Sequence, residues 1–124
     1  MDKLNVIDKS FLRLESPRHP FHVAGLMILK LPEKASAKKV RSLVAWGEKL
    51  NTFWPVLNKK LADPDDLSNG AWVQEEDFHP ERHVLHYALP QPGRMEDLLN
   101  LVSRAHERQL DRSRPLWELH VIEG

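Results

Sequence analysis

The sequence predicts an α/β fold, a mixed sheet with helices packed on it. Stretches of helical periodicity alternate with short apolar stretches, in the order helix, strand, helix, strand, strand, helix, strand. One predicted strand is apolar on both faces, which is typical of a strand in the middle of an α/β sheet. The 124 residues fit a single domain, and 41% hydrophobic with 29% charged residues indicates a globular chain, not a disordered one.

The first helix is expected to begin at Asn5, whose side chain can accept a hydrogen bond from a free N–H of the first turn. Asp8 lies in that turn, where a negative charge is favourable. Pro17 ends the segment. The apolar residues at helical spacing within it are Ile7, Phe11 and Leu14.

The next predicted element is a strand from His22 to Leu31, which Pro32 closes. Its apolar residues fall on both alternating faces, so we expect it in the middle of the sheet with both sides covered. Gly25 within this strand would let another backbone or a ligand approach closely.

A second helix is expected with Ser36 as its cap, and Trp54-Pro55 should break it. Its apolar stripe consists of Val40, Leu43, Val44, Gly47 and Leu50. The Asp, Pro, Ser and Asn residues between Ala62 and Gly70 predict an exposed loop.

Two short strands are predicted next, Ala71–Gln74 and His83–Leu89. A turn at Pro90, Pro92 and Gly93 follows. The strongest helical periodicity then runs from about residue 94 to residue 110. The residues expected to point inward from that helix are Met95, Leu98, Leu99, Val102 and Ala105.

The last predicted strand is Trp117–Ile122, where Trp, Leu and Val alternate with Glu, His and Ile. Glu123-Gly124 resembles a strand that enters a turn, so we expect the final strand to lack a partner on one edge.

Composition excludes several classes of protein. Without cysteine, the chain has no disulfide, thiol nucleophile or thiolate metal site. The longest apolar run, Val23–Leu29, is too short to span a bilayer, and no signal-peptide core follows Met1. We therefore expect a cytoplasmic protein.

The formal net charge is zero, but the two halves of the chain differ. Residues 1–60 carry 12 Lys and Arg against 5 acids, a net +7, and residues 61–124 carry 6 Arg against 13 acids, a net −7. Either the two segments pack beside each other, or the basic segment forms a surface for phosphates, anionic lipid or coenzyme A. Nucleic acid is not expected as a partner, because the basic residues are not interleaved with aromatic ones.

Three histidines, His79, His83 and His86, have a spacing at which imidazoles can bind zinc. However, residues three apart on a strand point to opposite faces, which favours structural, hydrogen-bonded histidines over a metal site. A Ser-His-Asp arrangement has no support beyond sequence proximity. Its candidate members are Ser103, Ser113, Asp111, His106 and His120.

The segment Asp111–Glu118 leaves a helix, offers Asp and Arg side chains that can pair, and enters a strand through a proline and a tryptophan. The simplest role for Trp117 is to fill the core. The stretch Leu110–Glu118, with His120 and Ile122–Gly124, resembles the bacterial wax ester synthase/acyl-CoA:diacylglycerol acyltransferase family. Matching segments elsewhere are Asp8, Phe11-Leu12, Glu15, Pro20–Leu26 (with Phe21 in place of the usual Met), Phe78, His83, His86, Ala88–Pro90 and Pro92-Gly93.

This resemblance implies an enzyme that transfers a fatty acyl group from acyl-CoA, its substrate, to a fatty alcohol or diacylglycerol, without a cofactor or metal. It implies part of the N-terminal half of a chloramphenicol acetyltransferase-like fold, the fold of coenzyme A-dependent acyltransferases. Pro115, Leu116 and Trp117 match the family's Pro-Leu-Trp motif, which is associated with substrate binding. Peripheral association with membranes or lipid inclusions is also expected.

The family's signature is His-His-x-x-x-Asp-Gly, whose second His is taken as the general base. No His-His pair occurs in this chain. Residues 1–124 are therefore expected to be a single N-terminal acyltransferase segment that stops just before that motif, without a catalytic residue of its own. It would act with the C-terminal portion of the same protein. The alternative is a non-catalytic module that binds lipid or coenzyme A.

Overall fold

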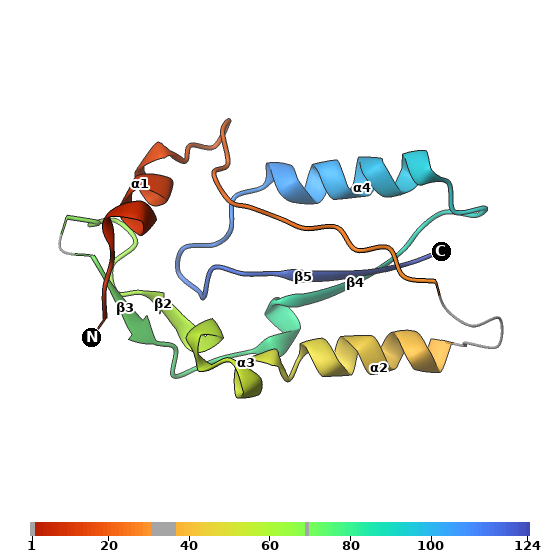
Figure 1. The fold of residues 1–124 in the computed structure, drawn as a ribbon, viewed down its shortest axis with the longest axis horizontal. Helices are drawn as coiled ribbons and strands as arrows, with labels where there is room; N and C mark the ends of the chain where they lie inside the picture. Colours follow the sequence, from red (N-terminus) through yellow and green to blue (C-terminus); the bar gives the residue numbers. More distant parts are fainter. Residues whose placement is uncertain (1, 31–36, 69) are drawn as a thin grey trace.

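Two small sheets, joined by helices, form the framework of the molecule. The computed structural model describes residues 2–30, 37–68 and 70–124. In Figure 1, helices α2 (Ala37–Gly47) and α4 (Met95–Glu107) lie on either side of strands β4 (Val84–Ala88) and β5 (Leu119–Glu123). Helix α1 (Val6–Leu14) and the second sheet lie together at one end.

The first sheet consists of β4 and β5, which run parallel with Val84 opposite Leu119 and Ala88 opposite Glu123. Parallel strands need a long crossover, and α4 provides it. The turn before α4 closes with Gly93 N–H donating to the Pro90 carbonyl at 2.8 Å. Gly93 has a φ of 76°, a conformation that favours glycine.

Helix α2 packs closely on this sheet at Gly47. A Cβ at that position would lie 2.7 Å from Leu119 Cδ2 and 3.3 Å from Val84 Cγ1. Val40 and Val84 are buried, and Gly47 is buried as well. Four residues of the predicted stripe, Val40, Leu43, Val44 and Gly47, therefore lie in α2 and are at least half-buried, whereas Leu50 falls in the next helix. The predicted cap, Ser36, lies outside the described residues.

The second sheet is antiparallel, in the order β1 (Asp2–Lys3), β3 (Ala71–Gln74), β2 (Lys59–Leu61). Leu61 of β2 and Ala71 of β3 are buried, as is Leu4, which directly follows β1. The strand at Ala71–Gln74 was predicted, but β1 and β2 were not, because two residues and a Lys-Lys-Leu segment give no period-2 signal. Parallel and antiparallel pairing are thus both present, in two separate sheets.

The expected helix boundaries are largely confirmed. Asn5 caps α1, with its Oδ1 accepting from the Asp8 N–H at 2.7 Å, and α1 ends three residues before Pro17. The second helix ends earlier than predicted, at Gly47, and Trp54-Pro55 instead ends the short helix that follows it. The chain there forms α3 (Leu50–Phe53) and a 3-10 helix (Pro55–Asn58), and a second 3-10 helix is Pro80–Arg82. Among the described residues, no helix is both long and apolar enough to cross a membrane.

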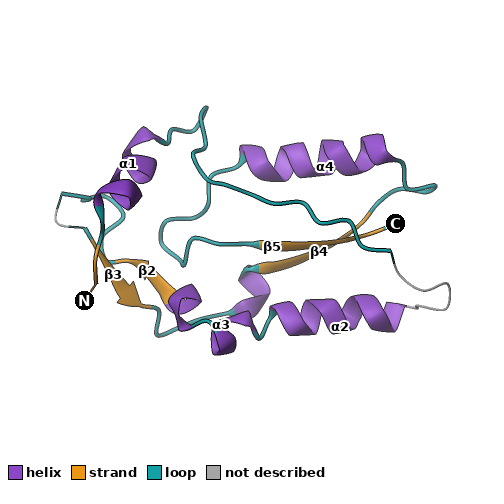
Figure 2. Cartoon of the chain, viewed as in Figure 1, coloured by secondary structure: helices purple, strands orange, loops and turns teal. Residues whose placement is uncertain are grey.

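The predicted central strand at His22–Leu31 is wrong for residues 22–30, and Leu31 lies outside the described residues. Figure 2 shows this segment as an extended loop, and it forms no strand. Every residue from 23 to 30 is exposed, Val23 by 86%. Gly25 has no atom near its Cβ position. An apolar pattern indicates which side chains require covering, but the backbone also needs a neighbouring strand, and the described part of the chain places none there.

Two details at the end of the chain also differ from the prediction. Met95 and Leu99 on α4 are at least half exposed, since no described side chain covers them fully. The last strand begins at Leu119, not Trp117. The Trp117 N–H donates to the Pro115 carbonyl at 3.0 Å, a tight turn that takes it out of the strand ladder.

Replacing Gly47 by Val is expected to destabilise the chain by about 1–3 kcal/mol, because the new side chain would overpack α2 against Leu119 and Val84. Urea unfolding measures this change in the free energy of unfolding. Gly25→Val is the matched control, since its Cβ meets open space, and it should change stability by less than about 0.5 kcal/mol. Equal effects of the two substitutions would contradict the packing described here.

Candidate functional site

The loop of residues 108–118, which joins α4 to β5, borders two hollows of different character. Leu110 and Leu116 line one of them, which we call the apolar cavity. Asp111, Ser113 and Arg114 line the other, which we call the polar cleft. The loop therefore contributes to both surfaces with neighbouring residues.

The predicted substrate-binding residues Pro115, Leu116 and Trp117 lie in three different environments. Pro115 is buried, and Leu116 lines the apolar cavity. Trp117 is half-buried and belongs to the lining of neither hollow. Of the three, Leu116 is the side chain placed to contact a ligand in the apolar cavity.

Trp117 instead anchors the loop. Its indole N–H donates to the Leu57 carbonyl at 2.9 Å, and its ring stacks on the His83 imidazole with centroids 4.7 Å apart. His83 is 4% exposed, and its Nδ1 lies 2.8 Å from the Trp117 carbonyl oxygen. His83 also stacks on Phe78 at 5.0 Å, and the Phe78 and Trp117 ring centroids lie 6.2 Å apart. The core role considered for Trp117 is the one its contacts support.

The apolar cavity has a volume of about 370 Å³, within the range of small-molecule sites. Helix α1 forms one wall, residues 21–23 form another, and Trp72 and the 108–118 loop complete it. Its lining residues are Ile7, Asp8, Phe11, Leu12, Glu15, Phe21, His22, Val23, Trp72, Leu110 and Leu116. Most of these side chains are apolar, so the cavity suits an alkyl chain better than a charged group.

Charged groups enter the cavity wall at Glu15. Its side chain is 8% exposed, and its Oε1 lies 3.1 Å from Arg112 Nη2. Its Oε2 accepts from the Phe21 N–H at 3.0 Å and lies 3.8 Å from His22 Nδ1. That imidazole nitrogen is buried without a hydrogen bond. The His22 ring meets His106 edge to face, with centroids 4.5 Å apart.

Glu15 and Arg112 both lie in segments that match the family, but their pairing was not predicted. They are 97 positions apart, and no local spacing rule connects such a pair. The sequence offered only one indication of the pair. Each residue is charged and lies in a segment whose apolar residues are expected to be buried, and a buried charge requires a partner of opposite charge.

The polar cleft has a volume of about 490 Å³. It is lined by Lys60, Glu75, Asp77, Arg82, Asp111, Ser113 and Arg114. Three cations face three acids there, so the cleft has no excess positive charge with which to bind a phosphate. The expected pairing of Asp and Arg in this segment is confirmed, with Arg114 Nη2 2.8 Å from Asp111 Oδ2.

Hydrogen bonds hold the pKa of Asp111 well below its ordinary value of 3.8, at about 2. The largest cause is the Ser113 hydroxyl, which donates to Oδ1 at 2.6 Å, followed by the Ser113 N–H at 2.9 Å. Arg114 adds two further donors to Oδ2. The Ser113 hydroxyl therefore donates its proton to a carboxylate and is not activated as a nucleophile.

The histidines considered for a metal site have separate partners. His83 is stacked and buried, His86 Nε2 lies 3.3 Å from Glu123 Oε2, and His79 lies beside two exposed acids. Within residues 2–30, 37–68 and 70–124, no cluster of three or more potential metal-ligating side chains occurs. His120 pairs with Glu118 at 2.9 Å, whereas Asp111 pairs with Ser113 and Arg114, so the contacts of these side chains do not form a Ser-His-Asp arrangement.

Comparison with known proteins gives a consistent result. The model of the family described as "Wax ester synthase/diacylglycerol acyltransferase catalytic domain" matches residues 4–124. The chain is 42% identical over 125 residues to a probable diacylglycerol O-acyltransferase of Mycobacterium tuberculosis. It is 38% identical over 127 residues to the O-acyltransferase WSD of Acinetobacter baylyi.

The match extends to three-dimensional structure. The solved wax ester synthase/diacylglycerol acyltransferase from Marinobacter aquaeolei VT8 superposes with a TM-score of 0.83 at 39% sequence identity. This agreement confirms the predicted α/β class and its resemblance to part of a coenzyme A-dependent acyltransferase fold. All of this chain is covered in each comparison, but it spans only 28% and 26% of the two curated relatives and 30% of the solved chain.

Asp111→Asn is expected to lower the free energy of unfolding at pH 7 by less than about 1 kcal/mol, because the ion pair is partly exposed. The folded pKa is depressed, so the carboxylate stabilises the fold above its ordinary value of 3.8 and loses this effect as the pH falls toward about 2. Urea unfolding of both proteins should therefore show a difference at pH 7 that vanishes near pH 2. Asp65→Asn, in an exposed loop, is the control. A difference independent of pH would contradict this assignment.

Proposed function

The chain belongs to the wax ester synthase/diacylglycerol acyltransferase family, and from this premise we propose that it forms the N-terminal part of an O-acyltransferase. The enzyme would transfer a fatty acyl group from acyl-CoA to a fatty alcohol or to diacylglycerol. The family match over residues 4–124 carries this proposal. Acyl-CoA acts as a substrate in this reaction, and no metal or other cofactor is required.

The residues described here would contribute substrate binding rather than proton transfer. The acceptor hydroxyl attacks the thioester carbonyl, its oxygen forms the new ester bond, its proton goes to a base, and the coenzyme A thiolate leaves. The family signature places that base in a His-His pair, and none of the seven histidines of this sequence is followed by another. We propose that the base comes from outside residues 1–124 and that the apolar cavity beside Leu116 accommodates an alkyl chain.

The remaining part of the same enzyme is the proposed partner. Two observations support it. The chain spans less than a third of the relatives it matches, and residues 23–30 expose an apolar segment that no described strand pairs. Large exposed apolar surfaces of this kind mark interfaces.

The second candidate function is a non-catalytic module that binds lipid or coenzyme A. One observation supports it, namely the apolar cavity, whose lining suits an alkyl chain and does not itself require a catalytic residue.

A transfer assay distinguishes the two. Radiolabelled palmitoyl-CoA is supplied with hexadecanol or dipalmitoylglycerol, both to the 124-residue chain and to the longer protein that contains it. We expect labelled wax ester or triacylglycerol from the longer protein and none from the chain alone. No product from the longer protein with either acceptor would overturn the enzyme proposal. Product from the chain alone would show that its own residues supply the base.

In the longer protein, Leu116→Ala is expected to raise the KM for a long-chain substrate by about tenfold, because it removes apolar contact area in the cavity. Trp117→Ala should instead lower stability by about 3 kcal/mol or more, since it removes the indole from its stack on His83. Steady-state kinetics and thermal unfolding measure the two effects. A Leu116→Ala protein with an unchanged KM would argue against the cavity as the alkyl site.

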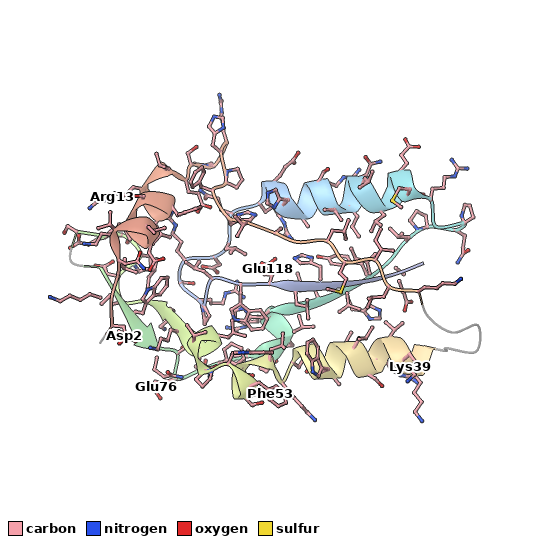
Figure 3. The ribbon with its side chains drawn as sticks, viewed as in Figure 1. Asp2, Arg13, Lys39, Phe53, Glu76 and Glu118 are labelled. Carbon is pink, nitrogen blue, oxygen red and sulfur yellow. The ribbon has the colours of Figure 1, made fainter. Side chains whose placement is uncertain are left out.

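We further propose peripheral association with anionic membrane or lipid surfaces through the basic segment, residues 1–60. Lys39 and Arg41 on α2 are exposed, as is Arg13 on α1, and Figure 3 shows Lys39 and Arg13 pointing outward. Part of the segment's charge is instead used in ion pairs with acids, such as Lys60 with Glu75 at 3.2 Å.

Sedimentation with vesicles tests this association. Binding of the chain to phosphatidylserine-containing vesicles should be weak at about 0.05 M salt and lost near 0.5 M, where the Debye length is only a few ångströms. Neutral phosphatidylcholine vesicles are the control and should not bind. Binding to both kinds of vesicle, or binding unaffected by salt, would contradict an electrostatic surface.

A further inference from the structure

The Glu15 carboxylate is nearly buried and makes contacts to two distant parts of the chain. Its side chain is 8% exposed. Oε1 accepts from Arg112 Nη2 at 3.1 Å, and Oε2 accepts from the Phe21 N–H at 3.0 Å. Glu15 therefore connects the end of α1 both to the segment that follows it and to the loop before β5.

Arg112 makes the same connection from the other side. Its Nη2 also donates to the Leu12 carbonyl at 2.5 Å, so one guanidinium nitrogen bonds two groups at the end of α1. Burying a charged pair is costly, and such a pair adds little stability compared with apolar side chains of similar size. What it does provide is a defined geometry, because charge-assisted hydrogen bonds are directional.

The parts held together by this pair are walls of the apolar cavity. Glu15 fixes the backbone at Phe21, and the Phe21 ring lies against Phe11 of α1 with centroids 4.8 Å apart. Arg112 fixes the loop between Leu110 and Leu116. Without the pair, the contacts left between α1 and residues 21–23 would include the Phe11–Phe21 ring contact, which is less directional than a charge-assisted hydrogen bond.

Resting on the proposed acyltransferase function, we propose that Glu15 is a positioning residue for the alkyl chain of the substrate. Through Arg112 and the Phe21 N–H, its carboxylate sets the width of the apolar cavity. It does not contact the reacting atoms and takes no part in proton transfer. Its effect should therefore fall on substrate binding and should grow with the length of the alkyl chain.

The test is Glu15→Gln in the longer protein that contains this chain. Glutamine keeps the shape and one acceptor oxygen but removes the charge and one of the two acceptors. We expect the KM for a sixteen-carbon alcohol to rise about tenfold, with kcat within about twofold of the parent. The KM for a four-carbon alcohol, too short to fill the cavity, should not change. Arg112→Gln should behave alike, and the double variant should be no worse than the poorer single variant, because both remove one interaction.

Glu75→Gln is the matched control. The Glu75 side chain is 10% exposed and pairs with Lys60 at 3.2 Å, so it resembles Glu15 in burial and pairing. It lines the polar cleft and not the apolar cavity. The control should leave both KM values unchanged. Thermal unfolding of every variant ensures that kinetics are compared on folded protein.

The outcomes separate this proposal from the proposed function. If the parent enzyme transfers acyl groups but Glu15→Gln has an unchanged KM, or raises the KM equally for short and long alcohols, the positioning role is overturned. A fall in kcat alone would also overturn it. If the parent shows no transfer, the proposed function fails. Binding of a pyrene-labelled fatty alcohol then tests the positioning role of Glu15 independently of catalysis. Weaker binding by Glu15→Gln but not by Glu75→Gln would support the positioning role, and equal binding would overturn it.

Discussion

The position of the 108–118 loop depends on the buried imidazole of His83. Its Nδ1 lies 2.8 Å from the Trp117 carbonyl oxygen, its ring stacks on Phe78 and on Trp117, and its own carbonyl accepts from the Leu119 N–H at 2.7 Å. These contacts fix the first residue of β5 against the residue that precedes β4. Leaving a buried ring nitrogen without a hydrogen bond costs about 1–3 kcal/mol, so other positions of the loop that separate His83 Nδ1 from the Trp117 carbonyl are disfavoured.

The consequences of this anchor extend in both directions along the chain. After it, β5 is in parallel register with β4, and Leu119 closes over Gly47 of α2. Before it, neighbouring residues of the loop face different surroundings. Arg112 reaches α1 and Glu15, whereas Arg114 turns to Asp111 in the polar cleft. This one anchored loop thus lies between the apolar cavity and the polar cleft and contributes side chains to both.

The sequence was sufficient to predict elements whose signals are local. The Asn5 cap, the break at Trp54-Pro55, the strand Ala71–Gln74 and the turn ending at Gly93 each follow from two to four neighbouring residues. The sequence was not sufficient for elements that form only when a distant segment pairs with them. Residues 22–30 have a strand pattern but form no strand, because pairing requires a second backbone that local pattern does not specify.

The same distinction applies to the site. Pro115, Leu116 and Trp117 were identified as a group, but a sequence motif does not say which way each side chain points. The tight turn at Pro115 directs Leu116 to the cavity and Trp117 to its stack on His83. The pairing of Glu15 with Arg112 was not predictable, because it depends on how α1 and the loop are brought together by tertiary packing.

The distribution of buried side chains explains why the apolar cavity depends on the Glu15–Arg112 pair for its shape. The buried hydrophobic side chains among the described residues are Leu4, Val40, Leu61, Ala71 and Val84, all beside the two sheets. None of them lies in the cavity wall, where Phe11, Phe21 and Val23 remain exposed. A wall made of exposed apolar side chains has no close-packed core to fix its spacing, because packing constrains only atoms that are covered on all sides. Directional contacts from Glu15 and Arg112 can set that spacing while the surface stays open to an alkyl chain.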